Sequence, residues 1–292
     1  MDVTLAKTFL AIVEVGNFRE ASERMCVTQS TVSARIKSLE EQLGKTLFVR
    51  NKSGATLTQA GNNFLEYAVS FIQIWEKALI KVSSEPAYQD YICVGARPGL
   101  WGPIIMKWLP WAKLEFPHIA LKADFGTADD LIRKLEEGII DIAILLSAPT
   151  MPGIKVEQLY MEHFYLVTDP DSAGILKSNP DISYREIMEK NYIDVDWGGE
   201  FRISRKHYFP GSFVPSLSVS VGIYGVSYIV ENGGFGYFPN SMIREYVNSY
   251  DLVIVEDAPV IQQPVYLACC KDNQGEHLQA LLDGFRTVVS GL

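Results

Sequence analysis

The chain has 292 residues, of which 48% are hydrophobic and 21% are charged, as is usual for a globular protein with two or three packed units. No stretch approaches the roughly 20 uncharged apolar residues that span a bilayer. The N-terminus also lacks the basic, apolar and small-residue zones of a signal peptide. These features predict a cytoplasmic protein without a membrane partner.

The net charge of −9 is unevenly distributed along the chain. Residues 1–84 carry 10 basic and 8 acidic side chains, whereas the remainder carries 16 basic and 27 acidic ones. Within residues 24–52 the balance is +4. A locally basic element on an acidic body is typical of a protein that touches nucleic acid with one end. Such a small excess of positive charge implies few phosphate contacts per chain, and a single copy should bind weakly. We therefore expect DNA to be bound by dimers or larger assemblies.

The first helix is expected over residues 2–15, as a scaffold with Leu5, Phe9, Ile12 and Val13 facing inward. Residues 18–43 then form two helical patterns that meet across a short break. In the second, apolar residues recur at a 4-3-4 spacing that makes one stripe: Val32, Ile36, Leu39 and Leu43. The opposite face carries short or basic side chains, Ser30, Ser33, Ala34 and Lys37, and Thr28 stands at the N-cap position.

A helix with an apolar back and a small polar front, held on a shorter helix, can enter a major groove. The pattern therefore predicts a helix-turn-helix. Its DNA-contacting residues are expected in the first turn and on the outer face: Thr28, Gln29, Ser30, Thr31, Ser33, Ala34, Arg35 and Lys37. The alternative is an ordinary helical hairpin in a core, because apolar stripes occur in every helix.

Two short strands, residues 47–50 and 55–57, flank a polar Asn-Lys-Ser-Gly turn and predict a β-hairpin. The hairpin carries Arg50 and Lys52, which suit phosphates or the minor groove. Such a wing favours DNA binding over the core hairpin.

These residues, taken together, resemble the N-terminal domain of the LysR-type transcriptional regulators. The matching pieces are Gly16-Asn17-Phe18, Ala21, Thr28-Gln29-Ser30, Val32-Ser33, Ile36, Leu39-Glu40, Leu43-Gly44, Leu47-Phe48, Arg50 and Leu57-Thr58-Gln59-Ala60-Gly61. They cover about the first fifth of the chain and are specific as a set. The resemblance implies an α/β protein with a winged helix-turn-helix, a long linker helix and a two-subdomain effector domain like that of periplasmic binding proteins.

A long helix is expected from Thr58, its N-cap, to about residue 84. Apolar residues follow a heptad seam along it: Phe64, Ala68, Phe71, Trp75, Ala78 and Val82. An apolar stripe of this width is unfavourable in contact with water. We therefore expect it to pack against a second copy of the chain. The alternative is packing against the chain's own domain. In the family this linker dimerises the DNA-binding domains, and assembly as a homodimer or homotetramer is implied.

Beyond a hinge at residues 83–86, strands and helices alternate, which predicts a parallel sheet covered on both faces. Strands are expected at 91–96, 119–125, 140–146, 159–168, 192–195, 236–239, 252–255 and 265–270, and helices at 100–115, 128–137, 184–190, 222–231, 242–247 and 277–289. The predicted domains are residues 1–58 for DNA binding, 59–86 for the linker and 87–292 for effector binding. Subdomain I of the last would hold about 87–165 and 267–292, and subdomain II 166–266, with crossings near 165–170 and 262–267.

Ligands in open α/β sheets bind beyond the carboxyl ends of strands. The residues there are the effector-cleft candidates: Arg97, Pro98, Gly99, Leu100, Trp101, Gly126, Thr127, Ser147, Asp196, Trp197 and Arg202. Arg97 suits a carboxylate, so a small anionic effector such as an organic acid is the expected ligand. A salt bridge to a local acid is the alternative role of Arg97, and Trp101 and Trp197 could wall a pocket or belong to the core. Many family members have Ser or Thr where Ala96-Arg97-Pro98 stands here, which leaves the ligand class open. Gly99-Leu100-Trp101, with Trp108-Leu109 after it, resembles a branch typified by a flagellar-operon repressor.

Other chemistries find no support in the sequence. The four cysteines make no CxxC motif and the four histidines show no metal-ligand spacing, so neither a thiol switch nor a metal site is expected. Gly233-Gly234-Phe235-Gly236 precedes a strand, whereas a dinucleotide site needs a helix there. No cofactor and no catalytic residue is predicted.

The sequence is compatible with three functions. The first is a LysR-type regulator that binds double-stranded promoter DNA and responds to an effector in its cleft, with RNA polymerase as a further partner if it activates. The second is a DNA-binding repressor or architectural protein whose C-terminal domain only oligomerises. The third, an enzyme or solute-binding module, lacks any catalytic constellation.

Overall fold

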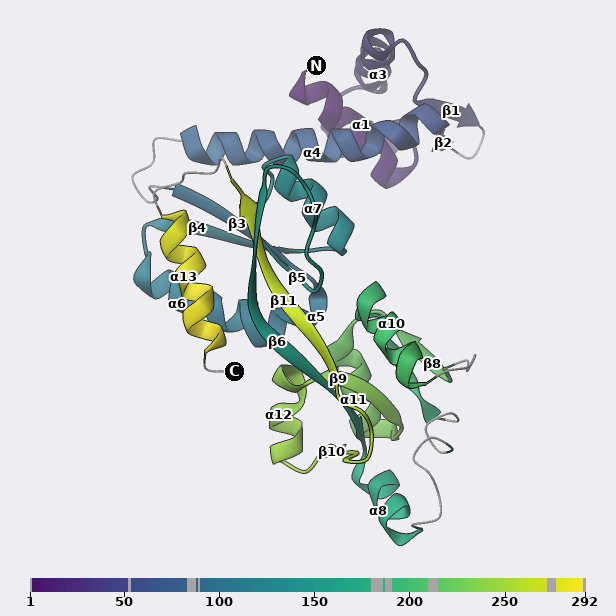
Figure 1. The fold of residues 1–292 in the computed structure, drawn as a ribbon. Coiled ribbons are helices and arrows are strands. Elements are labelled where there is room, and N and C mark those ends of the chain that lie inside the picture. The colour runs from purple at the N-terminus through teal and green to yellow at the C-terminus, as the bar shows by residue number, and fades with distance from the viewer. Residues whose placement is uncertain are drawn as a thin grey trace. The chain divides into compact units, whose positions relative to one another are not determined.

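The computed structural model describes residues 2–51, 54–82, 88, 90–179, 186, 191–209, 215–271 and 277–290 (Figure 1). The chain divides into two compact units. One holds residues 1–91 with 137–139, and the other holds residues 92–136 with 140–292. The helix expected at 184–190 lies outside the described residues apart from Glu186, and so does the hinge at 83–86.

The N-terminal unit consists of four helices and a β-hairpin: α1 (Val3–Val15), α2 (Phe18–Arg24), α3 (Gln29–Leu43), β1 (Phe48–Asn51), β2 (Gly54–Leu57) and α4 (Gln59–Val82). Its core joins α1 to the stripe on α3, because Phe9, Val32 and Leu39 are fully buried together. Leu43, expected in the same stripe, is 42% exposed. The helix-turn-helix and wing predicted from the sequence are therefore present.

Local capping explains where these helices begin and end. The Thr28 side chain accepts the backbone N–H of Thr31 and starts α3, as expected. The Asn17 side chain accepts the N–H groups of Arg19 and Glu20 and starts α2. Gly16 and Gly44 end α1 and α3 with φ of 74° and 67°, a left-handed conformation that glycine adopts without strain.

Backbone contacts fix the wing to the helices. Strands β1 and β2 pair antiparallel, with Phe48 opposite Leu57. The N–H of Ala55 donates to the Gly16 carbonyl at 2.7 Å, and Glu40 Oε1 accepts the N–H of Leu47 at 2.6 Å. A Cβ on Gly61 would lie 2.2 Å from the Leu47 carbonyl oxygen, so the first turn of α4 can lie against the residue before β1 only with glycine there.

The second unit is built on a seven-stranded sheet with the order β10-β6-β11-β5-β3-β4, in which β9 also pairs with β6. Its strands are β3 (Asp90–Ala96), β4 (Ile119–Phe125), β5 (Ile142–Leu145), β6 (Ile154–Thr168), β9 (Phe235–Pro239), β10 (Val253–Ile254) and β11 (Ile261–Cys270). Strands β3 and β5 are parallel, but β11 runs antiparallel to both β5 and β6. The expectation of a parallel sheet was therefore wrong in this part. Strand direction depends on where the chain returns, which alternation alone does not determine.

The helices of this unit are α5 (Pro98–Leu100), α6 (Met106–Glu115), α7 (Ala128–Glu136), α8 (Pro170–Ser178), α10 (Gly199–Tyr208), α11 (Gly222–Asn232), α12 (Asn240–Asn248) and α13 (Leu278–Val289). The single helix expected at 100–115 is divided by a π-helical segment, η1 (Trp101–Ile105). It contains Pro103, which has no N–H for the regular α-helical ladder. Helices α8 and α10 were not predicted, nor was β8 (Leu217–Val219), which pairs with β7 (Ile193–Val195).

Two hydrophobic cores define two subdomains of the second unit. In the first, Trp108 stacks on Phe285 at 4.4 Å between ring centroids and donates from Nε1 to the Leu281 carbonyl. The second gathers Phe164, Trp197, Phe201, Phe235 and Phe238.

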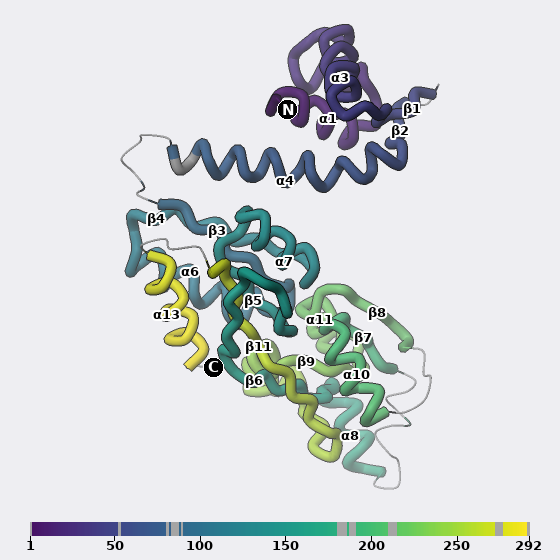
Figure 2. Tube along the Cα trace, turned by 45° about the horizontal axis from the view of Figure 1, so that its top comes forward, coloured from purple at the N-terminus to yellow at the C-terminus, as the bar shows by residue number. Residues whose placement is uncertain are grey.

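Strands β6 and β11 run side by side through both cores (Figures 1 and 2). In β6 the side chains change from the first core to the second between Tyr160 and Phe164, before the range of 165–170 expected for the crossing. In β11 they change between Ile261 and Val265, next to a register shift at Val265/Tyr266.

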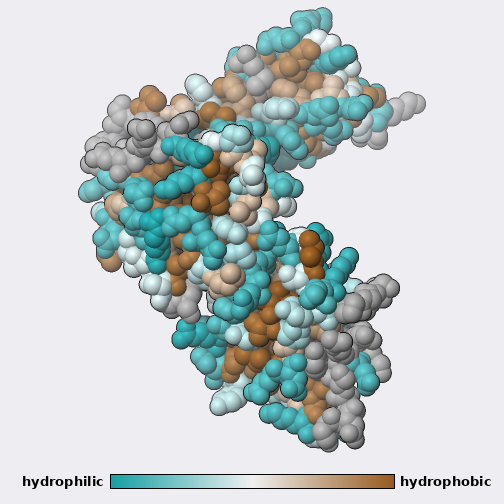
Figure 3. Space-filling view, in the orientation of Figure 1, coloured by the Kyte–Doolittle hydropathy of each residue, from teal (hydrophilic) through white to brown (hydrophobic). Residues whose placement is uncertain are grey.

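Hydrophilic and hydrophobic side chains are interspersed over the face of the molecule seen in Figure 3. Of the helices in the described part of the chain, none is sufficiently long and apolar to cross a membrane.

We expect Gly61→Ala to lower the free energy of unfolding by about 1–3 kcal/mol, because the added methyl group meets a backbone carbonyl that cannot move freely. Gly174→Ala is the matched control, since Gly174 also lies within a helix but has nothing within 4 Å of the added Cβ. The control should gain about 0.5–1 kcal/mol from helix propensity. Urea unfolding followed by circular dichroism measures both, and equal effects would contradict the close contact between Gly61 and the Leu47 carbonyl.

Candidate functional site

The outer face of α3 is open to solvent. Gln29, Ser30, Ala34 and Lys37 are exposed and Thr31 and Ser33 are half-buried. On the inward side of the same helix, Val32, Ile36 and Leu39 are at most 1% exposed. The face is built from short side chains, which let a helix backbone approach base edges closely.

Hydroxyl groups cluster at the N-terminus of α3. Thr28 Oγ1 lies 2.8 Å from both Ser30 Oγ and Thr31 Oγ1. Thr28 therefore has a structural role as cap, and Ser30 and Thr31 present hydroxyls at the end of the helix where unpaired N–H groups favour anions. Lys37 pairs only weakly, at 3.7 Å, with exposed Glu41, so its ammonium group can exchange this partner for a phosphate at little cost.

Two of the expected arginines are held by the protein itself. Arg35 turns back toward α1, where its Nη1 lies 3.5 Å from the hydroxyl of buried Thr8. The guanidinium carbon of Arg50 lies 3.8 Å above the centre of the Phe18 ring, a cation–π contact that holds the Arg50 side chain against α2. Lys52, expected beside Arg50, lies outside the described residues.

Helix α4 carries the predicted apolar seam on one face, which is largely buried in the first half of the helix and exposed toward its C-terminal end. Ala68 is fully buried and Phe64 packs edge-on against Phe9 of α1 at 5.0 Å, so this part of the predicted seam contacts its own unit. Phe71 is half-buried. Toward the C-terminal end the apolar side chains are exposed, with Trp75 at 41% and Val82 at 79%. Ala78 is exposed as well, together with the large residues Tyr67, Ile74 and Leu79.

In the second unit, Arg97 contacts the loop that carries Trp197 where the two subdomains join. Arg97 Nη2 donates to the Asp196 backbone carbonyl at 3.2 Å and lies 4.0 Å from its carboxylate. Burial lowers the pKa of the Arg97 guanidinium below the usual arginine value, an effect opposed by the charge of Asp196 and reinforced by that of Arg202. The salt bridge considered as the alternative role of Arg97 is thus present.

The Trp197 side chain is 3% exposed and lies between two glycines. A Cβ on Gly99 would come within 2.4 Å of the indole, and one on Gly222 within 2.2 Å. Gly198, the next residue, has a φ of 105° and lies close to the Arg97 guanidinium. The sequence indicated Gly198 as a neighbour of Trp197, but Gly222 was missed, because its role depends on a tryptophan that approaches through space.

The remaining effector candidates have other roles or lie apart. Leu100 is in the first core, and Trp101 packs at its edge with its indole Nε1 buried and unpaired among the described residues. Thr127 Oγ1 accepts the N–H of Asp130 at the start of α7, which is a capping role. The others are Pro98 at the start of α5, Gly126 against Asp130, Ser147 after β5, and exposed Arg202 on α10.

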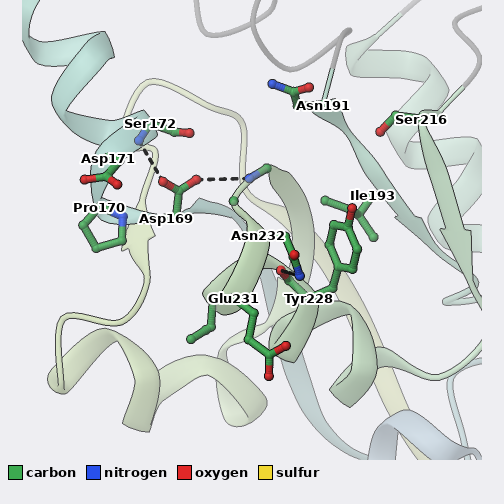
Figure 4. A pocket seen from close by; sticks show the side chains of 13 residues that line it. Asp169, Pro170, Asp171, Ser172, Asn191, Ile193, Ser216, Tyr228, Glu231 and Asn232 are labelled. Carbon is green, nitrogen blue, oxygen red and sulfur yellow. Dashed lines mark hydrogen bonds between the residues drawn. The ribbon is translucent and has the colours of Figure 1, made fainter.

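A polar pocket of about 580 Å³ lies in the second subdomain and contains none of the predicted site residues (Figure 4). Asp169 lines it, but Oδ1 accepts the N–H of Ser172 and Oδ2 that of Gly234. These bonds cap α8 and fasten the turn before β9, and both are drawn in Figure 4. The carboxylate therefore has a structural role.

A winged helix-turn-helix joined by a long helix to a two-subdomain α/β domain defines a class: bacterial regulators that couple a DNA-binding head to a sensor-type domain. Residues 3–62 match the family described as bacterial regulatory helix-turn-helix protein, lysR family, and residues 88–290 match the LysR substrate binding domain. The chain belongs to the LysR family of DNA-binding transcriptional regulators, which confirms the resemblance seen in the N-terminal motif.

Similar proteins cover nearly the whole chain. The HTH-type transcriptional regulator HdfR of Yersinia enterocolitica is 28% identical over 280 residues, which are 95% of this chain and 94% of HdfR. HdfR is the regulator that typifies the branch which Gly99-Leu100-Trp101 resembles, so this likeness agrees with that expectation.

Solved structures show the same fold. CbnR, a LysR family regulator, has a TM-score of 0.75 at 18% identity over 99% of both chains. CbnR in complex with its target DNA has a TM-score of 0.73 at 18% identity, over 99% of this chain and 100% of CbnR. LysG of Corynebacterium glutamicum with bound effector Arg has a TM-score of 0.54 at 17% identity, over 100% and 99% of the two chains.

Proposed function

We propose that this regulator binds promoter DNA by placing the outer face of α3 in a major groove. Gln29 and Ser33 would contact base edges, while Arg50 on the wing contacts the phosphate backbone. The observation that supports this proposal is the two-sidedness of α3, whose apolar stripe is buried while Ser30 and Lys37 are exposed. A structure of the relative CbnR contains its target DNA, in accord with this assignment.

The same proposal includes assembly of at least two copies. The exposed apolar row near the end of α4, which includes Trp75 and Val82, needs a cover, and a second α4 supplies one of matching length and character. Two DNA-binding units would also multiply the few phosphate contacts that one chain offers.

For the regulatory domain, the contacts of Arg97 and Trp197 favour a role that needs no small-molecule effector. Arg97, expected to anchor an organic acid, is bonded to Asp196, and Trp197 fills the space between Gly99 and Gly222. An anionic effector would have to displace Asp196 from Arg97. LysG was solved with bound effector Arg, so a small-molecule effector is the competing candidate to be tested.

Gln29→Ala and Ser33→Ala should relax base preference, each costing about 1–3 kcal/mol on the preferred sequence only. Arg50→Ala should weaken all sequences alike and reduce the salt dependence of binding by about one phosphate contact. Lys107→Ala, which removes one exposed charged side chain from α6, controls for net charge. Binding to a randomised DNA pool at several salt concentrations measures these effects, and equal losses across sequences for all three variants would exclude the division of roles.

Trp75→Asp should convert dimers into monomers, because a carboxylate cannot be buried against an apolar helix without a partner. Glu66→Ala, on the opposite side of α4 at about 100° per residue, should leave the assembly intact. Sedimentation velocity distinguishes the two states. Dimers that persist in Trp75→Asp would show that the exposed row is not the contact between copies.

We expect millimolar organic acids to leave the unfolding temperature of the full chain unchanged, since Arg97 already has a carboxylate neighbour and Trp197 fills the junction. Thermal shift measurements across a panel of mono- and dicarboxylic acids test this. Stabilisation by one acid that disappears in Arg97→Ala would instead support the effector-responsive candidate.

A further inference from the structure

The Trp197 side chain lies at the junction between the two subdomains, in contact with one glycine from each. Gly99 belongs to the segment after β3, in the first subdomain, and Gly222 starts α11 in the second. Both face the Trp197 ring so closely that a methyl group at either position would overlap it. Neither glycine has a positive φ, so the constraint is space for the indole rather than backbone conformation.

Trp197 is anchored firmly on the second subdomain. Its Nε1 donates to the Tyr237 backbone carbonyl at 2.8 Å, and its ring lies 5.3 Å from Phe164 and 6.0 Å from Phe238 between centroids. These contacts fix the position of the ring within the second core, and the ring edge that contains Cζ3 lies against Gly99.

A polar contact beside the indole ties the same loop to the first subdomain. The Arg97 side chain is 16% exposed and donates to the Asp196 carbonyl. A Cβ on Gly198 would lie 3.0 Å from Arg97 Nη1, so glycine at that position gives the guanidinium room as well. The loop 196–198 therefore makes two contacts with the first subdomain: the apolar contact of Trp197 with Gly99 and the hydrogen bond from Arg97 to the Asp196 carbonyl.

We propose that Trp197 is an internal occupant of the subdomain junction, which holds the two subdomains in the DNA-binding arrangement without any small molecule. The indole does what a bound effector does in a two-subdomain sensor: it makes contacts to both halves at once and so favours one relative placement. The proposal rests on the DNA-binding function proposed above, because DNA affinity is its readout.

Trp197→Ala would leave a space with the shape of an indole between Gly99 and Gly222, and free indole is the probe that fits it. For the full chain on a promoter fragment selected with the wild type, we expect Trp197→Ala to weaken binding at least about tenfold. Millimolar indole should restore most of this loss in a saturable way and leave the wild type unchanged.

Trp108→Ala is the matched control, since it also removes a buried indole with a bonded Nε1, but from the first core. Indole should not change its DNA affinity. Trp197→Ala that binds DNA like the wild type, or that gains nothing from indole, overturns the proposal. A wild type that binds no promoter fragment overturns the DNA-binding function instead, so the two failures are distinguishable.

Gly99→Ala tests the contact without removing the tryptophan, in case Trp197→Ala does not fold. Its methyl group should push the indole away and weaken DNA binding at least about fivefold. Gly102→Ala, in the neighbouring segment with nothing within 4 Å of the added Cβ, should have no effect. Equal DNA affinities for Gly99→Ala and Gly102→Ala would overturn the proposal, whereas a loss confined to Gly99→Ala supports it.

Discussion

Burial of one apolar stripe on α3 is the interaction on which the proposed DNA-binding surface depends. Val32, Ile36 and Leu39 are essentially removed from water, and each such side chain contributes about 1.5–3 kcal/mol. Packing them against α1 fixes the rotation of α3 about its axis. Once the back of the helix is fixed, the small polar side chains can only face outward, so the core determines the binding surface without containing any of its residues.

Most of the N-terminal unit could be predicted because local chemistry determines it. The Thr28 cap, the left-handed glycines at 16 and 44 and the polar turn of the wing act within a few residues of one another. Strand direction in the second unit could not be predicted, because β11 returns from a distant part of the sequence to pair antiparallel with β5 and β6. Helix α8 carries a local start signal in Asp169 before Pro170, whereas α10 follows Gly198 without a side-chain cap and carries no such signal.

The candidate sites divide in the same way. The outer face of α3 follows from periodicity, which placed Ser30, Ala34 and Lys37 on the side that is exposed. Ser33, placed on the same side, is half-buried, and the inward turn of Arg35 depends on Thr8 of another helix. At the subdomain junction, the sequence indicated Arg97, Gly99 and Trp197 as separate candidates. That Gly99 contacts the Trp197 ring, that Arg97 bonds to the residue before it, and that Gly222 completes the arrangement depends on packing between segments far apart in the sequence, which no local pattern reveals.

Strands β6 and β11 have a mechanical consequence for the regulatory domain. Each strand continues from one core into the other, so the subdomains share hydrogen-bonded backbone and are not joined by a slack loop. Any rotation of one half against the other must twist this two-stranded ribbon, most easily at the register shift beside Val265. Through this shared ribbon, a rotation of one subdomain is coupled to the position of the other.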